Sequence, residues 1–141
     1  MTVFCCRINN VDRQFKSGQN LISELGVAPG ETVLDVGSGT GLLAEFTADT
    51  VGITGAVMGI DPLPLRVELA TRRSRSNLNF AVGDAKDLSS FPRASFDVVY
   101  LNAVFHWLHE KITPLRQFNR VLKAGGRLGI TPRLSTFSAT C

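Results

Sequence analysis

The glycine-rich stretch from Gly37 to Gly41 is the feature that most limits how this chain can fold. It follows residues 32–36, a short apolar run rich in β-branched side chains that predicts a buried strand. It precedes residues 41–51, where apolar side chains recur at helical spacing. Glycines permit a tight turn and a close backbone approach, so amide groups and the helix N-terminus can face a bound carboxylate or phosphate. A strand, a glycine bend and a helix in this order predict a Rossmann-like ligand-binding unit.

The same alternation of strand and helix patterns continues along the chain. Further strands are predicted at 56–60, 78–82, 96–101 and 128–130 with its flanks, and further helices at 12–25, from Pro62 to about Asn77, and at about 114–122. Alternating elements imply right-handed parallel crossovers. We therefore expect an α/β fold, a doubly wound and mainly parallel sheet of about five strands with helices on both faces.

Length and composition favour one domain over residues 1–141. A chain of 141 residues with 44% hydrophobic residues buries a core without disulfides or metals. We expect residues 1–28 to form a helical lead-in and residues 132–141 an irregular tail, where Ser, Thr, Pro and Arg replace the apolar periodicity.

Charge and cysteine content restrict the partners and the location. The net charge is +3, and the basic cluster of Arg72, Arg73 and Arg75 is typical of a solvated helix end, so no nucleic-acid partner is expected. Cys5, Cys6 and Cys141 form neither an even disulfide framework nor a CxxC metal spacing, which predicts a reducing, cytoplasmic location and no metal. No run approaches the roughly 18 to 20 apolar residues of a membrane span, so no membrane partner is expected.

Asp61 strengthens the prediction of a nucleoside site. It follows Gly41 by twenty residues, at the end of the second predicted strand, where a carboxylate can accept both hydroxyls of a ribose. The glycines run GxGxG, with Leu42 where the dinucleotide fingerprint GxGxxG has its last glycine. Residues 34–41 closely resemble motif I of class I S-adenosylmethionine-dependent methyltransferases of the type 11 kind. The resemblance extends over residues 15–130, because 83–85, 96–100 and 122–126 match later motifs in the right order.

The resemblance implies S-adenosylmethionine as cofactor and S-adenosylhomocysteine as product. The implied cofactor-binding residues are Asp35, Gly37, Ser38, Gly39, Thr40, Gly41, Asp61, Pro62, Leu63, Gly83, Asp84, Ala85 and Asn102. In such a site the glycine bend cradles the methionine part and Asp61 holds the ribose. Asp84 accepts from the adenine amino group, the Ala85 amide faces the ring and Leu63 covers it. The alternatives are surface carboxylates at Asp61 and Asp84, a supporting role beneath the bend for Asp35, and local pairing for Asp97.

Residues 102–108 indicate where an acceptor approaches the methyl group. They resemble the segment after the fourth strand in small-molecule carboxyl methyltransferases such as trans-aconitate methyltransferase. We expect His106 to be catalytic and Phe15, His106 and Trp107 to bind substrate, with core packing as the alternative. The expected function is methyl transfer to a small-molecule acceptor through oxygen, carboxyl, sulfur or nitrogen. The alternatives are an inactive cofactor-binding regulatory or interaction protein, and a scaffold for a reaction other than methylation.

The end of the chain leads to a prediction about assembly. In the resembled family the sheet continues to strands six and seven, the last antiparallel, whereas residues 132–141 show no strand or helix pattern. We expect these two strands to be missing. An unpaired strand edge invites pairing with another chain, which predicts a homodimer joined across the fifth strand or through exchanged elements.

Overall fold

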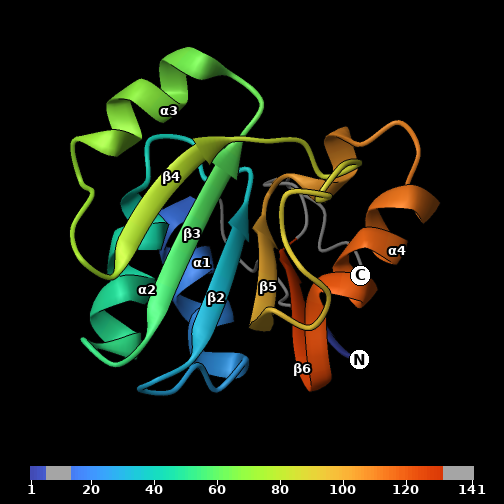
Figure 1. The fold of residues 1–141 in the computed structure, drawn as a ribbon, viewed down its shortest axis with the longest axis horizontal. Coiled ribbons are helices and arrows are strands. Elements are labelled where there is room, and N and C mark those ends of the chain that lie inside the picture. Colours follow the sequence, from blue (N-terminus) through green and yellow to red (C-terminus); the bar gives the residue numbers. More distant parts are fainter. Residues whose placement is uncertain (6–13, 132–141) are drawn as a thin grey trace.

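A computed structural model describes residues 1–5 and 14–131 of the chain. Its strands form a single sheet in the order β1-β6-β5-β2-β3-β4, and every pairing between them is parallel. The strands are β1 (Thr2–Cys5), β2 (Thr32–Val36), β3 (Ala56–Asp61), β4 (Leu78–Val82), β5 (Phe96–Asn102) and β6 (Leu122–Thr131). The helices are α1 (Gln14–Glu24), α2 (Leu42–Val51), α3 (Pro64–Thr71), α4 (Ile112–Val121) and the short 3₁₀ turn η1 (Phe105–Trp107). Figure 1 shows the twisted sheet with helices on its two faces, which confirms the expected architecture.

Two predicted helices differ in length from those observed. The helix expected from Pro62 to Asn77 ends at Thr71, because the chain then turns and the Asn77 side chain donates to the carbonyls of Ala48 and Gly52 at the end of α2. The helix expected at 12–25 begins, within the described residues, at Gln14.

The strand β1 was not predicted: residues 1–28, expected as a helical lead-in, contain this strand as well as α1. β1 pairs in parallel with β6, from Thr2 opposite Arg127 to Cys5 opposite Ile130. A four-residue edge strand carries little periodicity of its own, and its pairing partner lies more than a hundred residues away. The edge of β6 that the dimer prediction relied on is therefore paired with β1.

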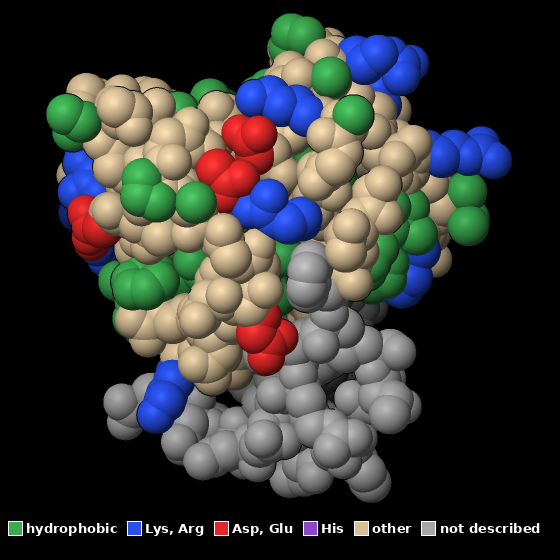
Figure 2. Space-filling view, turned by 90° about the horizontal axis from the view of Figure 1, so that it is seen from below, with side chains coloured by type: hydrophobic (Ala, Val, Ile, Leu, Met, Phe, Trp, Pro, Cys, Tyr) green, Lys and Arg blue, Asp and Glu red, His purple; other side chains and the backbone are tan. Residues whose placement is uncertain are grey.

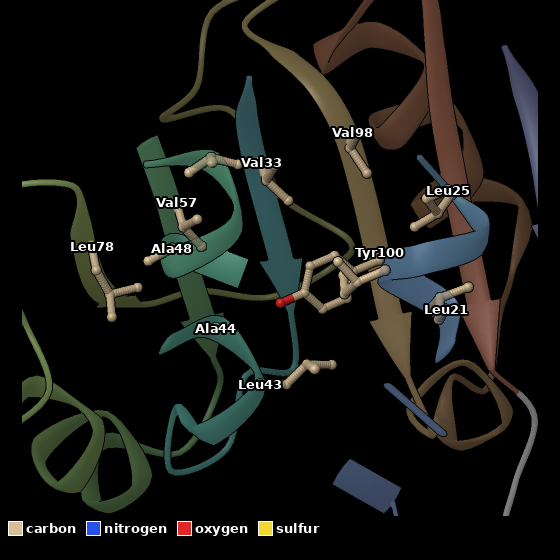
Figure 3. Packing of buried hydrophobic residues seen from close by; sticks show 12 residues of the cluster. Leu21, Leu25, Val33, Leu43, Ala44, Ala48, Val57, Leu78, Val98 and Tyr100 are labelled. Carbon is tan, nitrogen blue, oxygen red and sulfur yellow. The ribbon is translucent and has the colours of Figure 1, made fainter. Parts of the chain in front are cut away.

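The core consists of two layers, one on each face of the sheet. α1 and α2 cover one face, where Leu21, Ala48, Val33 and Tyr100 are buried together, as Figure 3 shows. α4 and the segment around Leu88 cover the other face. Alternate residues of one strand serve opposite layers, so Val33 and Leu34 belong to different clusters.

On the face seen along the strands from their amino ends, the described residues form no broad basic stripe. Figure 2 shows basic side chains there apart from one another, with acidic and hydrophobic ones between them. Two of the clustered arginines are engaged with α2, since Arg73 pairs with Glu45 at 3.1 Å and Arg75 with Asp49. Among residues 1–5 and 14–131, no helix is long and apolar enough to cross a membrane.

Candidate functional site

A cavity of about 960 Å³ opens where the carboxyl ends of β2, β3 and β5 meet. From β2 the chain crosses to β3 and β4 on one side, and it later returns to β5 and β6 on the other. Ligands bind at such a switch point in open α/β sheets. Twelve of the predicted site residues line the cavity: Phe15, Gly37, Ser38, Gly39, Thr40, Asp61, Pro62, Gly83, Asp84, Ala85, Asn102 and Trp107.

The glycine bend is held by the neighbouring strand β3. The amides of Gly37 and Ser38 donate to the carbonyl of Ile60 at 2.8 and 2.9 Å, and the amide of Gly39 donates to Asp61 Oδ2 at 3.0 Å. The expectation that the bend's amides face a ligand is therefore wrong for these three, because they donate to acceptors in β3. Gly39 has a φ of +57°, and a Cβ built on it meets no atom within 4 Å. The positive φ favours glycine at this position, and the space beside it is open.

Gly41 serves packing. It has a φ of +86°, and a Cβ at this position would lie 2.7 Å from Phe80 Cζ. Gly41 does not line the cavity. The observed role of Gly41 is therefore to let the start of α2 pack closely against Phe80 of β4.

Asp61 joins two backbone segments at the cavity wall. Its side chain is buried, and its Oδ1 accepts from the amide of Leu63 at 3.0 Å while Oδ2 accepts from Gly39. The guanidinium of Arg66 lies 3.7 Å from Oδ2. The carboxylate thus orients both the glycine bend and the turn into α3.

Asp84 lies at the exposed mouth of the same cavity. Its Oδ1 accepts from the amide of Lys86 at 3.0 Å, and the neighbouring Ala85 is buried. Asp61 and Asp84 belong to different strand ends and face one cavity. This convergence is the arrangement that the motif order predicts.

Asp35 lies beneath the bend instead of in the cavity. Tyr100 Oη donates to Asp35 Oδ2 at 2.7 Å, and Thr47 Oγ1 lies 3.1 Å from the same hydroxyl. Figure 3 shows Tyr100 reaching from β5 toward β2. Burial raises the pKa of Asp35 from its ordinary 3.8 to about 7; the Tyr100 hydrogen bond lowers it, and the nearby charge of Asp61 raises it further. The structure therefore favours the supporting role for Asp35, which is buried and does not line the cavity.

Two other predicted site residues, Leu63 and His106, differ from expectation or lie outside the description. Leu63 is about half exposed and does not line the cavity. The side chain of His106 lies outside the described part of the structure, although its backbone is in η1. Asp97 pairs locally, since its Oδ2 accepts from the amide of Thr32 at 2.8 Å and lies 3.4 Å from Lys123 Nζ.

Sequence reasoning missed several residues of the cavity wall. Val104 lies over the bend, because a Cβ on Gly37 would be 2.6 Å from Val104 Cγ2. Arg66 and Lys86 follow Asp61 and Asp84 closely in sequence, and that proximity was the available signal. The remaining lining residues that were not predicted are Gln14, Val36, Leu42, Leu43, Ala103, Leu108, His109 and Glu110.

Two polar groups bear on whether the site fits a ligand. In the described part of the chain, Ser38 Oγ is buried without a hydrogen-bond partner. Buried hydroxyls in folded proteins almost always have a partner, so this one calls for a ligand group or a water. Among residues 1–5 and 14–131, no three His, Cys, Asp or Glu side chains lie close enough to hold a metal ion.

Comparison with protein families and curated proteins gives a single picture. Residues 34–130 match the family model described as a methyltransferase domain. The chain is 35% identical over 114 residues to an arsenite methyltransferase from Halobacterium salinarum, covering 78% of this chain and 29% of that protein. It is 40% identical over 108 residues to the ubiquinone/menaquinone biosynthesis C-methyltransferase UbiE from Ectopseudomonas mendocina, covering 73% and 42%. The chain thus spans less than half the length of these two relatives.

Solved structures show the same fold. A SAM-dependent methyltransferase from Aquifex aeolicus superposes with a TM-score of 0.69 at 27% identity, covering 75% of this chain and 58% of that one. The [4+2]-cyclase SpnF superposes with a TM-score of 0.73 at 25% identity, covering 86% and 47%.

Proposed function

The chain belongs to the class I S-adenosylmethionine-dependent methyltransferase family, and on that premise we propose that it transfers a methyl group from S-adenosylmethionine to a small organic acceptor. One observation carries the proposal: the glycine bend, Asp61 and Asp84 line the same cavity at the switch point of the sheet. S-adenosylhomocysteine would be the product.

The residues present fit this cofactor. We propose that Asp61 holds the ribose, since each carboxylate oxygen keeps a further acceptor site after taking one backbone amide. Asp84 and Ala85 would hold the adenine, and the bend with Ser38 Oγ would hold the methionine part. When bound, the cofactor supplies an activated methyl carbon for in-line displacement, without a metal or a covalent enzyme intermediate.

The protein's own contribution is positioning and control of protons at the acceptor end. We propose that Phe15 and Trp107 contact the acceptor, since both line the cavity. A hydroxyl acceptor would need a base, and we propose His106 from its place in the sequence after β5. His109 lines the cavity wall. Glu110 is less suited, because hydrogen bonds from Thr113 hold its pKa below the usual range and use its carboxylate to cap α4.

The relatives' acceptors differ, so the acceptor of this chain is a proposal at the level of class. A metalloid such as arsenite would call for soft thiolate ligands, and no cysteine is among the described residues that line the cavity. Part of the cavity wall is apolar, and it is formed by Phe15, Val104, Trp107 and Leu108. These residues favour a small organic molecule.

Cofactor binding is tested by a matched pair of aspartates in one loop. Asp84 and Asp87 each accept from the amide two residues ahead, at 3.0 Å, yet only Asp84 lines the cavity. We expect Asp84→Ala to weaken S-adenosylhomocysteine binding about tenfold in calorimetry, the scale of one hydrogen bond to a charged group, and Asp87→Ala to leave it unchanged. Equal affinities in the two variants would contradict the proposed site.

A second candidate function follows from the likeness to SpnF, which is a [4+2]-cyclase. The scaffold could then hold the cofactor while catalysing a reaction without methyl transfer, or act as a binding protein only. Binding of S-adenosylmethionine with no S-adenosylhomocysteine formed across a panel of phenol, carboxylate, thiol and amine acceptors would favour these readings.

Two further proposals concern the setting of the protein. We propose a cytoplasmic location, from the cysteine pattern. A homodimer also stays a proposal, although β1 now pairs with the edge of β6 on which it was based. Sedimentation at micromolar concentration tests it, and a clean monomer would overturn it.

A further inference from the structure

The ends of β5, β6 and α1 meet at one side of the cavity through a small set of hydrogen bonds. Asn102 and Thr131 are opposite each other in the β5–β6 register and are the last residues of their strands. Thr131 Oγ1 donates to Asn102 Oδ1 at 2.7 Å, and the amide of Ala103 donates to Thr131 Oγ1, also at 2.7 Å. Both side chains are buried, so these bonds form away from bulk water.

Asn102 also holds the first turn of α1. Its Nδ2 donates to the carbonyl of Gln14 at 2.9 Å, and Gln14 Nε2 donates back to the carbonyl of Asn102 at 3.3 Å. α1 can come this close because residue 18 is glycine, since a Cβ there would lie 2.9 Å from Asn102 Nδ2. This contact places Phe15 on the cavity wall.

The hydrogen bonds of Asn102 and Thr131, called the junction below, also fix the segment after β5. Ala103 adopts a φ of +59°, a left-handed conformation that is unfavourable for alanine. The hydrogen bond from its amide to Thr131 holds it there, and the next side chain, Val104, covers the bend at Gly37. The junction therefore sets two walls of the cavity.

We propose that Asn102 and Thr131 are positioning residues, which act on ligand binding by holding α1 and Ala103 in place. The ligand part of this inference rests on the proposed function. Thr131 is the informative position, because it is fully buried and does not line the cavity. Any effect of its hydroxyl on affinity must pass through Asn102 or Ala103.

The test compares three variants of the full chain. Thr131→Val removes the hydroxyl at nearly constant volume, and Thr131→Ser restores it. Arg127→Gln is the control, because Arg127 lies on the same strand and anchors the opposite end of α1 by donating to the carbonyl of Leu25 at 2.7 Å. The readouts are S-adenosylhomocysteine affinity by calorimetry and amide hydrogen exchange by NMR.

We expect Thr131→Val to speed exchange of the Ala103 amide, whose acceptor is lost, and of the first half of α1. Affinity should fall about fivefold, the scale of one buried hydrogen bond, and Thr131→Ser should recover both readouts. Arg127→Gln should speed exchange near Leu25 and keep affinity within about twofold. The inference is overturned if Thr131→Val matches the wild type in both readouts, or if the control weakens binding equally. A wild type that binds no S-adenosylhomocysteine refutes the proposed function, while the exchange data still test the junction.

Discussion

Replacing Asp35 by asparagine should remove the pH dependence that this buried carboxyl imposes on stability. Asp35 is 2% exposed and accepts a hydrogen bond from Tyr100. Its pKa in the folded protein is about 7, against an ordinary value of 3.8. Between these two pH values, Asp35 is therefore protonated in the folded protein and ionised in the unfolded chain. Stability from this group is fully present below about pH 4 and is lost as the pH rises through 7.

The size of the stability difference follows from the gap between the folded and unfolded pKa values of Asp35. Each pH unit between the two pKa values changes the free energy of unfolding by about 1.4 kcal/mol. Between pH 5 and pH 8, the wild type should lose about 3 kcal/mol of stability relative to Asp35→Asn. The asparagine amide carries its own burial cost of about 1–3 kcal/mol, but that cost does not change with pH.

Urea unfolding of both chains at pH 5, 6, 7 and 8 measures this difference. Other titrating groups are shared by the two chains and cancel in the comparison. Asp49→Asn, at an exposed aspartate on α2, is the control for the loss of one carboxylate from the chain. Tyr100→Phe should move the transition of Asp35 to higher pH, since the tyrosine hydrogen bond lowers that pKa. Parallel stability curves for wild type and Asp35→Asn would show that Asp35 is ionised throughout, and the reasoning would fail.

Three further variants, one of them a control, test the packing around the glycine bend and α2. Gly41→Ala should destabilise the fold by about 2–4 kcal/mol, because it combines a positive φ with a Cβ 2.7 Å from Phe80 Cζ. Gly125→Ala, where φ is +77° and the space is open, should cost only about 1–2 kcal/mol, and equal losses would contradict the packing role. Asn77→Ala should cost about 2–3 kcal/mol, because two carbonyls at the end of α2 lose their donor. Thermal unfolding measures all three, and an Asn77→Ala variant as stable as wild type would contradict that role.

The candidate site was predictable where its parts are local in sequence. The bend at Gly37 to Gly41 and Asp61 belong to one strand-helix-strand unit, so their spacing alone indicates that they meet. Asp84 could be found in the same way, at the end of the next strand. The structure places residues 37–40, Asp61 and Asp84 on one cavity, while their contacts with a cofactor stay proposals.

Other predictions failed because a neighbouring strand or side chain already hydrogen-bonds the group that was expected to face a ligand. The amides of Gly37 and Ser38 donate hydrogen bonds to the carbonyl of Ile60, and the carboxylate of Asp35 accepts one from Tyr100. A motif shows that a polar group is present near a site, but it does not show which neighbour takes its hydrogen bond.

The sequence by itself determined the alternation of strands and helices from α1 onward, the parallel sheet and the end of the sheet where the cavity opens. Each of these follows from periodicity and turn chemistry within about thirty residues, which local burial imposes directly on the chain. Only the tertiary structure decided that β1 lies beside β6, that Val104 covers Gly37, and that Asn102 joins Gln14 to Thr131. These contacts join residues far apart in the chain. They depend on how the packed layers meet, and no local pattern records that.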